Sequence, residues 1–308
     1  MGVPPHLFFM VSALFHYLGP AFAVLLFQHV NVLGVTWLRI ASAAVVFALW
    51  RRPWRVFREL APRSRLTLVA LGVVLAAMNA CFYQAIDRLP LGTVGGIEFL
   101  GPVALGAAGV RSHRNLAALG LVIGGVFLLT DIRLASQPLG LLFAFGNCAL
   151  FVLYVVLGHR IARDGGRSGI DRLGAAMLVA LVAISPLAIT EAGPAFRDAR
   201  LLAAGFGVGV CSSVIPYVCD QLAMARLPRF TFALLLALLP ATATTVGILV
   251  LGQVPTVIEA AGVLLVIAGV ATHQQYPQDK VTPEEWRREP GDVSAGPPGI
   301  DEVRRVAR

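Results

Sequence analysis

The stretch AIDRLPLGTVGGIEFLGP at residues 85–102 decides the fold, because the chain repeats its pattern. The counterpart is AMARLPRFTFALLLALLP at residues 223–240, in which both prolines recur 138 residues later. Two further matches keep the same order: VIGGV at 122–126 with VIAGV at 266–270, and SALF at 12–15 with CALF at 148–151. Each match is short, but four in one order predict a duplicated unit of about 140 residues.

The composition indicates that lipid, and not water, surrounds most of this chain. Hydrophobic residues make up 57% of the 308 residues and charged residues only 14%, against about 45–50% and about 25% in soluble domains. The apolar stretches approach the length of about 20 residues that a helix needs to cross a bilayer. A membrane barrel would need alternating segments of about ten residues, and the sequence has none. The prediction is an all-α integral membrane protein.

Ten transmembrane helices can be drawn, five in each half of the chain. They are expected at 7–27, 33–50, 67–86, 91–110, 116–131, 138–158, 173–190, 201–223, 231–251 and 257–272. The first repeat then covers residues 1–131 and the second covers residues 132–272. Because five is odd, the second repeat enters the membrane from the opposite side, so the two repeats are inverted.

The loop arginines agree with this topology if both chain ends are cytoplasmic. The outer loops hold four arginines, namely Arg88, Arg133, Arg197 and Arg200. The inner loops hold fourteen: Arg51, Arg52, Arg55, Arg58, Arg63, Arg65, Arg111, Arg114, Arg160, Arg163, Arg167, Arg172, Arg226 and Arg229. This asymmetry follows the positive-inside rule. The net charge of +8 therefore reflects topology, and no nucleic-acid partner is indicated, although the basic loop 51–65 can also touch anionic lipid headgroups.

The N-terminal segment, the C-terminal segment and the cysteines each allow an alternative interpretation. Ala21-Phe22-Ala23 resembles a signal-peptide cleavage site, but Met1–His6 lacks the usual basic residues, so a retained first span is favoured. Residues 273–308 are charged and interrupted by prolines, which predicts a disordered cytoplasmic tail, with an interaction peptide as the alternative. The four cysteines lie within spans without a CxxC motif, so no metal site, redox site or cofactor is expected.

Polar residues inside the spans are the candidates for function. Glu98 has no charged residue within nine positions on either side, so it must face a cavity, pair or be protonated. Counting 1.5 Å per residue from the outer side, Arg39 lies about 9 Å deep and Glu98 about 12 Å deep. Asn79 and Asn147 fall at similar depths, and His16 lies somewhat deeper. These residues predict a polar layer that lines a cavity. The alternatives are an Arg39–Glu98 ion pair that only locks two helices, and a His16 that is simply satisfied between helices.

Prolines and glycines mark special backbone positions. Pro102 and Pro240 lie inside spans at matched repeat positions, where each removes a helix hydrogen bond. Interrupted helices at equivalent positions point to a binding site, whereas a static kink is the alternative. Pro216 has no counterpart in the first half. Glycine pairs four residues apart predict close helix crossings at Gly92/Gly96, Gly120/Gly124 and Gly205/Gly209.

Two strings carry a resemblance to a known family. FYQAIDRLPLGTVGGIEFLGP at 82–102 and IPYVCDQLAMARLPRFTFALLLALLP at 215–240 resemble the EamA-domain branch of the drug/metabolite transporter superfamily, and within it the threonine/homoserine exporter group. The likeness extends over about residues 7–272. It implies functional positions at Glu98, Gly101, Pro102, Pro216, Tyr217 and Pro240. Tyr217 could instead be an interfacial anchor. The family often has a glutamate where this chain has Gln253, after Leu251-Gly252.

The resemblance implies a multi-pass secondary transporter of a bacterial inner membrane that exports small metabolites. Amino acids such as threonine and homoserine are the expected substrates, moved by alternating access and proton coupling. Glu98 is expected to carry the proton, while Arg39 holds a substrate carboxylate or tunes Glu98. No enzyme activity is expected. An importer, a multidrug or metabolite carrier of the same fold, and a non-transporting scaffold are the alternatives. The expected partners are a small-molecule substrate, membrane lipids and protons, and a homodimer is an open alternative.

Overall fold

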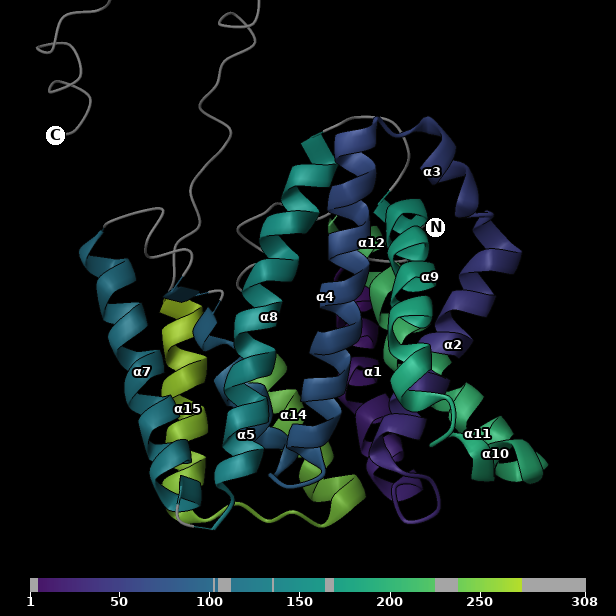
Figure 1. Ribbon diagram of the computed structural model, residues 1–308. Helices are drawn as coiled ribbons and strands as arrows, with labels where there is room; N and C mark the ends of the chain where they lie inside the picture. The colour runs from purple at the N-terminus through teal and green to yellow at the C-terminus, as the bar shows by residue number, and fades with distance from the viewer. Residues whose placement is uncertain are drawn as a thin grey trace, which may run out of the picture. The chain divides into compact units, whose positions relative to one another are not determined.

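The computed structural model describes residues 5–101, 103–104, 112–134, 136–163, 169–224 and 238–272. Within these ranges every regular element is a helix (Figure 1). Pro102 and the predicted tail at 273–308 lie outside the described residues. The all-α prediction therefore holds for the part of the chain that is described.

Each predicted span coincides, wholly or in part, with a helical segment. The first half contains α1 (Pro5–Leu26), α2 (Val32–Arg51), α3 (Trp54–Glu59), α4 (Pro62–Ile86), α5 (Leu91–Glu98) and α7 (His113–Leu134). The second half contains α8 (Pro138–Arg163), α9 (Gly169–Ala188), α10 (Gly193–Arg197), α11 (Ala199–Gly209), η1 (Val210–Val214), α12 (Ile215–Met224), α14 (Leu238–Leu251) and α15 (Val257–Thr272). Among the described residues, six helical stretches are long and apolar enough to cross a membrane, and three shorter apolar helices accompany them.

Side chains at the helix ends explain where several helices begin. Asn31 precedes α2 and accepts a hydrogen bond from the Leu33 backbone nitrogen at 3.0 Å. Asp198 does the same for Arg200 before α11, at 2.8 Å. In the first turn of α15, Glu259 accepts from the backbone nitrogen of Thr256, the residue before the helix, at 2.8 Å. Such caps satisfy N–H groups that have no partner inside the helix.

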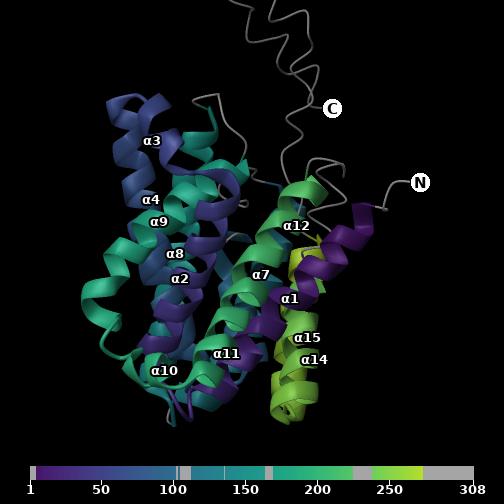
Figure 2. The same cartoon turned by 90° about the vertical axis from the view of Figure 1, so that its right-hand side faces the viewer.

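The strongest helix contacts join the two halves of the chain. α7 packs along α15, and α5 packs along α14. α2 packs against α9, while α4 contacts α8 and α1 contacts α12 (Figures 1 and 2). The bundle is therefore built from interleaved halves, and each half depends on the other for its burial.

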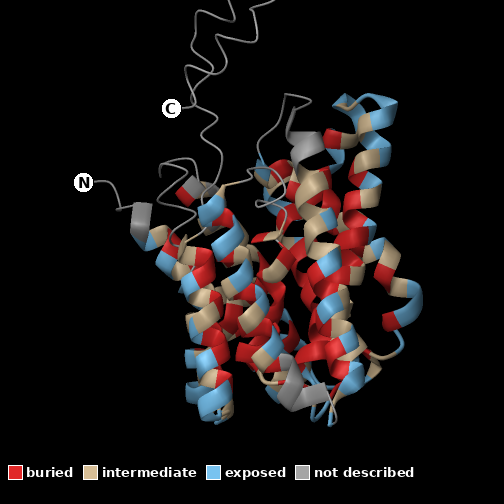
Figure 3. Ribbon diagram, turned by 90° about the vertical axis from the view of Figure 1, so that its left-hand side faces the viewer, coloured by how far each residue is buried: buried red, intermediate tan, exposed pale blue. Residues whose placement is uncertain are grey.

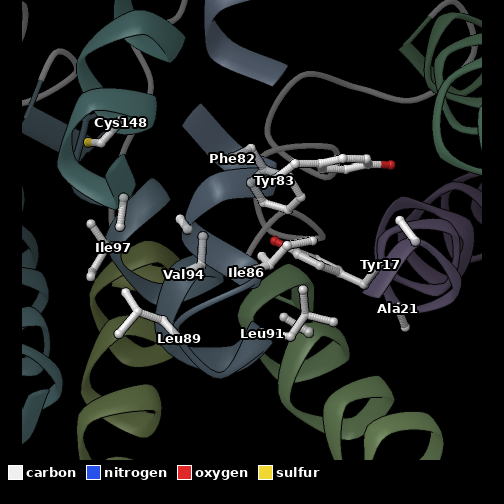
Figure 4. Close-up of a cluster of buried hydrophobic side chains, with 14 of the residues drawn as sticks. Tyr17, Ala21, Phe82, Tyr83, Ile86, Leu89, Leu91, Val94, Ile97 and Cys148 are labelled. Carbon is white, nitrogen blue, oxygen red and sulfur yellow. The ribbon is translucent and has the colours of Figure 1, made fainter. Parts of the chain in front are cut away.

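Burial follows the apolar composition. Buried residues concentrate between the helices, and exposed residues lie on the outer faces and at the helix ends (Figure 3). Large apolar side chains nevertheless face outward, for example Leu49 at 82% and Leu249 at 78% exposure. Such surfaces are a liability in water and are expected in lipid. One large buried cluster joins α1, α4, α5 and α8 (Figure 4).

Glycines allow several of the helix crossings. A Cβ added at Gly209 would lie 2.8 Å from the Arg39 carbonyl oxygen, and one at Gly96 would lie 2.7 Å from Leu129. The predicted close crossing at Gly205/Gly209 is thus confirmed, because both positions meet α2. The prediction of one crossing face at Gly92/Gly96 is wrong, because Gly92 meets Thr244 of α14 whereas Gly96 meets the Leu129 side chain of α7. The prediction for Gly120/Gly124 is wrong, because no described atom lies within 4 Å of a Cβ at either position. On that helix Gly125 makes the close approach instead, 2.6 Å from the Gly262 oxygen.

The eighth predicted span is interrupted by a π-helix. Val210–Val214 separates α11 from α12, and the Ile215 N–H donates to the Val210 oxygen five residues earlier. A π turn contains more residues than an α turn and frequently marks a functional position. Figure 2 shows α11 and α12 running on from one another on either side of it. The sequence predicted an unbroken helix here, because nothing in the apolar pattern signals the wider turn.

Candidate functional site

Glu98 is the last residue of α5 and its side chain is buried. Its Oε1 accepts a hydrogen bond from Asn147 Nδ2 of α8 at 3.3 Å. The amide oxygen Oδ1 of Asn147 is also buried and has no hydrogen-bond partner among the described residues. The α5–α8 contact therefore has a carboxylate and an unpaired acceptor side by side, and a bound proton or a donor group would satisfy both.

Arg39 lies in the middle of α2 and is held against the π-helix. Its Nε donates to Ser213 Oγ at 3.0 Å, and its Nη2 donates to the Ser212 carbonyl oxygen at 3.2 Å. The guanidinium carbon lies 5.1 Å from the centre of the Tyr83 ring on α4, within the range of a cation–π interaction. Three helical elements thus fix the position of one buried cation.

Pro216 follows the π-helix directly and has no N–H to donate to the turn before it. Pro216 is itself buried, and its own carbonyl accepts from Ser12 Oγ of α1 at 3.2 Å. The carbonyl of Ser212, in the turn before the proline, is the acceptor that orients Arg39.

Arg39 and Glu98 do not form the ion pair that was one interpretation of the sequence. Among the described residues, the salt bridges join Arg51 to Asp171 and Arg88 to Asp87. Arg39 is satisfied by a hydroxyl, a carbonyl and an aromatic face, and Glu98 by an amide. The structural ion-pair hypothesis is therefore wrong, because neutral groups closer to each charge provide its partners.

Tyr17 of α1 belongs to the same interior region and was not singled out from the sequence. Its side chain is fully buried, and its hydroxyl has no hydrogen-bond partner among the described residues. A Cβ added at Gly95 would lie 3.2 Å from this hydroxyl, so the hydroxyl lies against α5 one turn before Glu98. Figure 4 shows the ring extending from α1 toward residues of α4 and α5. His16 is half-buried and its ring meets the Tyr17 ring edge-on at 5.2 Å.

The remaining predicted site residues divide between local and peripheral positions. Asn79 is buried, but its Nδ2 donates to the Leu75 oxygen of its own helix at 2.7 Å, which satisfies it locally. Tyr217 is half-buried and packs at the edge of the apolar cluster around α2, α4 and α9. Pro240 is buried near the start of α14, where its oxygen accepts from Thr244 at 3.0 Å. The hydrogen bonds of Asn79 and Pro240 therefore lie within their own helices and not at Glu98.

Gln253, the departure from the family pattern, has a structural role. Its Oε1 accepts from the backbone nitrogen of Leu91 at 2.9 Å. Leu91 is the first residue of α5, whose N–H has no partner inside the helix. The loop after α14 therefore caps the helix that carries Glu98. Within the described ranges, no three His, Cys, Asp or Glu side chains gather in a way that could hold a metal ion.

A bundle of apolar helices of membrane length with a buried carboxylate and a buried guanidinium is the arrangement expected of a multi-pass membrane transporter. The chain belongs to the EamA-like transporter family, whose profile matches residues 138–272. Threonine/homoserine exporter RhtA from Salmonella typhimurium (strain LT2) and that from Escherichia coli (strain K12) are each 30% identical to it over 253 residues. Each alignment covers 81% of this chain and 84% of the relative.

A solved structure described as "Crystal structure of protein" shares the fold. Its TM-score is 0.56 at 18% identity, and the match covers 88% of this chain and 97% of the other. The family and the two threonine/homoserine exporters are transporters, not enzymes. The protein is thus a membrane transporter, and the family predicted from residues 82–102 and 215–240 is confirmed.

Proposed function

We propose that this protein exports small amino acids, with threonine and homoserine as the first candidates, by proton-driven alternating access. The main support for this proposal is that Glu98 is buried in the bundle and that its described hydrogen-bond partner is the neutral side chain of Asn147. Its protonation state can therefore change without breaking an ion pair. The relatives at 30% identity are threonine/homoserine exporters, which supports the substrate class.

The proposed architecture is ten membrane-spanning helices in two inverted repeats, residues 1–131 and 132–272. Three contacts join helices at equivalent repeat positions: α2 with α9, α5 with α14, and α7 with α15. In the predicted repeats α4 corresponds to α12, and α8 corresponds to α1. The contact of α4 with α8 therefore has its counterpart in the contact of α12 with α1. This exchange symmetry supports two related halves that rock about a shared interior. The proposal places the protein in a bacterial inner membrane with both chain ends cytoplasmic.

Arg39 is the proposed ligand for the substrate carboxylate. A guanidinium has five N–H donors, and the described contacts of Arg39 engage its Nε and Nη2 only. Nη1 is left to donate to a carboxylate, which makes a charge-assisted hydrogen bond. Tyr17 and Asn147 offer a hydroxyl and an amide oxygen for the polar remainder of an amino acid.

Glu98 is the proposed proton carrier. Its carboxylate takes up one proton from the outside and releases that proton to the inside as substrate leaves the cell. Asn147 Nδ2 keeps the carboxyl group oriented in both states, because an amide N–H can donate to a carboxylate oxygen and to the carbonyl oxygen of a neutral carboxyl group. His16 and Tyr217 are proposed as pathway residues of lower importance, and Pro240 as a helix break.

Transport in proteoliposomes separates these roles. Glu98→Gln should abolish accumulation driven by a pH gradient while substrate counterflow continues. Arg39→Gln should raise the threonine concentration for half-maximal counterflow about tenfold or more, because a charge-assisted bond contributes about 1.5–3 kcal/mol. Glu191→Gln, the same substitution in the α9–α10 connection, is the matched control and should behave as wild type.

Two kinds of result would count against the proposal. Gradient-driven transport by Glu98→Gln at the wild-type rate, in monodisperse protein, would remove the proton role. Uptake rather than efflux would identify an importer, movement of unrelated compounds a multidrug or metabolite carrier, and the absence of any movement a scaffold.

A further inference from the structure

The inner end of α2 forms a basic pocket that the transport site does not use. The chain reads WRRPWR at residues 50–55, and Pro53 prevents α2 from continuing. Arg52 closes the helix in the left-handed conformation with φ 50°, and α3 begins at Trp54. This sharp turn gathers the arginines around a pocket of about 340 Å³ that is lined by Trp50, Arg51, Arg52, Arg55 and Asp171.

One wall of the pocket is fixed by an ion pair. Arg51 Nε lies 2.8 Å from Asp171 Oδ1, and Arg51 Nη2 lies 3.3 Å from Asp171 Oδ2. Asp171 is buried in the first turn of α9. The guanidinium of Arg51 also lies 5.5 Å from the Trp50 ring centre. A bidentate pair of this kind holds both side chains in one geometry.

The pocket has an excess of positive charge. Asp171 compensates Arg51, whereas Arg52 and Arg55 are exposed and have no ion-pair or hydrogen-bond partner among the described side chains. Two free guanidinium groups at a pocket of this size are suited to an anion with several oxygens, such as a phosphate group.

The surroundings indicate that the phosphate belongs to a lipid. Val45 and Leu49 lie four residues apart on one face of α2 and are 47% and 82% exposed. This apolar column leads along α2 to the pocket, so acyl chains can follow it. Trp50 and Trp54 are both exposed beside the arginines, as expected for residues at the membrane–water boundary.

We propose that this pocket binds the phosphate of an anionic phospholipid, with Arg52 and Arg55 as its ligands and the Arg51–Asp171 pair as its fixed wall. Basic pockets between transmembrane helices are suited to such headgroups. The site is separate from Glu98 and Arg39, so it holds one lipid per chain whether or not substrate is present.

Native mass spectrometry of the full chain in neutral detergent tests the proposal. Phosphatidylglycerol should bind to the wild type with one tightly held molecule, and phosphatidylcholine should bind much more weakly. The double variant Arg52→Gln/Arg55→Gln should bind phosphatidylglycerol about tenfold more weakly. Arg58→Gln/Arg63→Gln removes the same charge from exposed positions that do not line the pocket, and it should match the wild type within about twofold.

Three outcomes would overturn the lipid assignment. The first is equal affinity for the two lipids. The second is an equal loss in both double variants, which would show attraction to net charge alone. The third is displacement of the lipid by inorganic phosphate at equal concentration, which would assign the pocket to a soluble phosphate. All four substituted arginines are exposed, so a monodisperse elution profile suffices to show that each variant folds.

Discussion

The crossing of α1 with the π-helix allows a sharp prediction about Gly19. A Cβ at Gly19 would lie 2.6 Å from the Ser212 nitrogen and 2.8 Å from its Cα. Ordinary contact begins at 3.4 Å, so Gly19→Ala must push one backbone away from the other by about 0.6–0.8 Å. Overpacking of this kind costs about 1–3 kcal/mol, and the backbone of Ser212 cannot rotate away as a side chain would.

The expected result is a lower thermal unfolding midpoint, measured for the protein in detergent. At about 2–4 °C per kcal/mol, Gly19→Ala should lower Tm by about 2–12 °C. The displacement also moves Ser212 and Ser213 relative to Arg39, so counterflow of threonine should fall as well.

Gly124→Ala on α7 is the matched control. A Cβ at Gly124 would meet no described atom within 4 Å, so alanine should stabilise the helix by about 0.5–1 kcal/mol. Its Tm should equal or exceed that of the wild type. A Gly19→Ala variant as stable as Gly124→Ala would show that α1 and the π-helix do not approach as closely as 2.6 Å from a Gly19 Cβ to the Ser212 nitrogen.

Three other substitutions test single contacts. Tyr17→Phe removes a buried hydroxyl without a described partner, so the free energy of unfolding should stay equal or rise by up to about 1–3 kcal/mol. The threonine concentration for half-maximal counterflow should rise, and an unchanged concentration would remove Tyr17 from the site. Asp171→Asn breaks the bidentate pair with Arg51, whose side chain is one-third exposed, and should lower the free energy of unfolding by about 1 kcal/mol or less. The difference from the wild type in a melting experiment should become smaller in 1 M salt, which screens the pair. Thr256→Val removes the hydroxyl that donates to Glu259 Oε2 at 3.0 Å and should lower the free energy of unfolding by about 0.5–2 kcal/mol in the same assay. A Tm equal to that of the wild type would show that this cap does not stabilise α15.

The helical segments could be predicted from sequence because lipid leaves the backbone few alternatives. An apolar run of membrane length must satisfy its own N–H and C=O groups, so the approximate positions of the spans follow from hydropathy. The short helices α3 and α10 were not predicted, since they lie in polar connections without a long apolar period. The count of ten spans and the inverted repeat stay predictions.

The site was predictable only for residues that are expensive to bury. Glu98 and Arg39 stood out because a charge inside a span is costly. Their partners did not stand out, because Ser212, Ser213 and Tyr17 are unremarkable in an apolar helix until the fold assembles them. One local signal was available: Pro216 lies four residues after Ser212, and proline has no N–H to donate to the turn before it. Asn79 shared the expected depth, but depth along a helix does not specify which way a side chain faces.

The π segment also sets the rotational phase of the helix that follows it. One surplus residue in the turn rotates α12 by about 100° relative to a continuous α-helix. Deleting a single position between Val210 and Val214 would let ordinary winding resume and would leave the face with Pro216 in its present direction, because the surplus residue is removed together with the wider turn. A relative with a one-residue gap at this place should therefore present the same wall to its central arginine, whereas a relative that keeps the residue in an unbroken α-helix should present a wall turned by about 100° and select a different cargo.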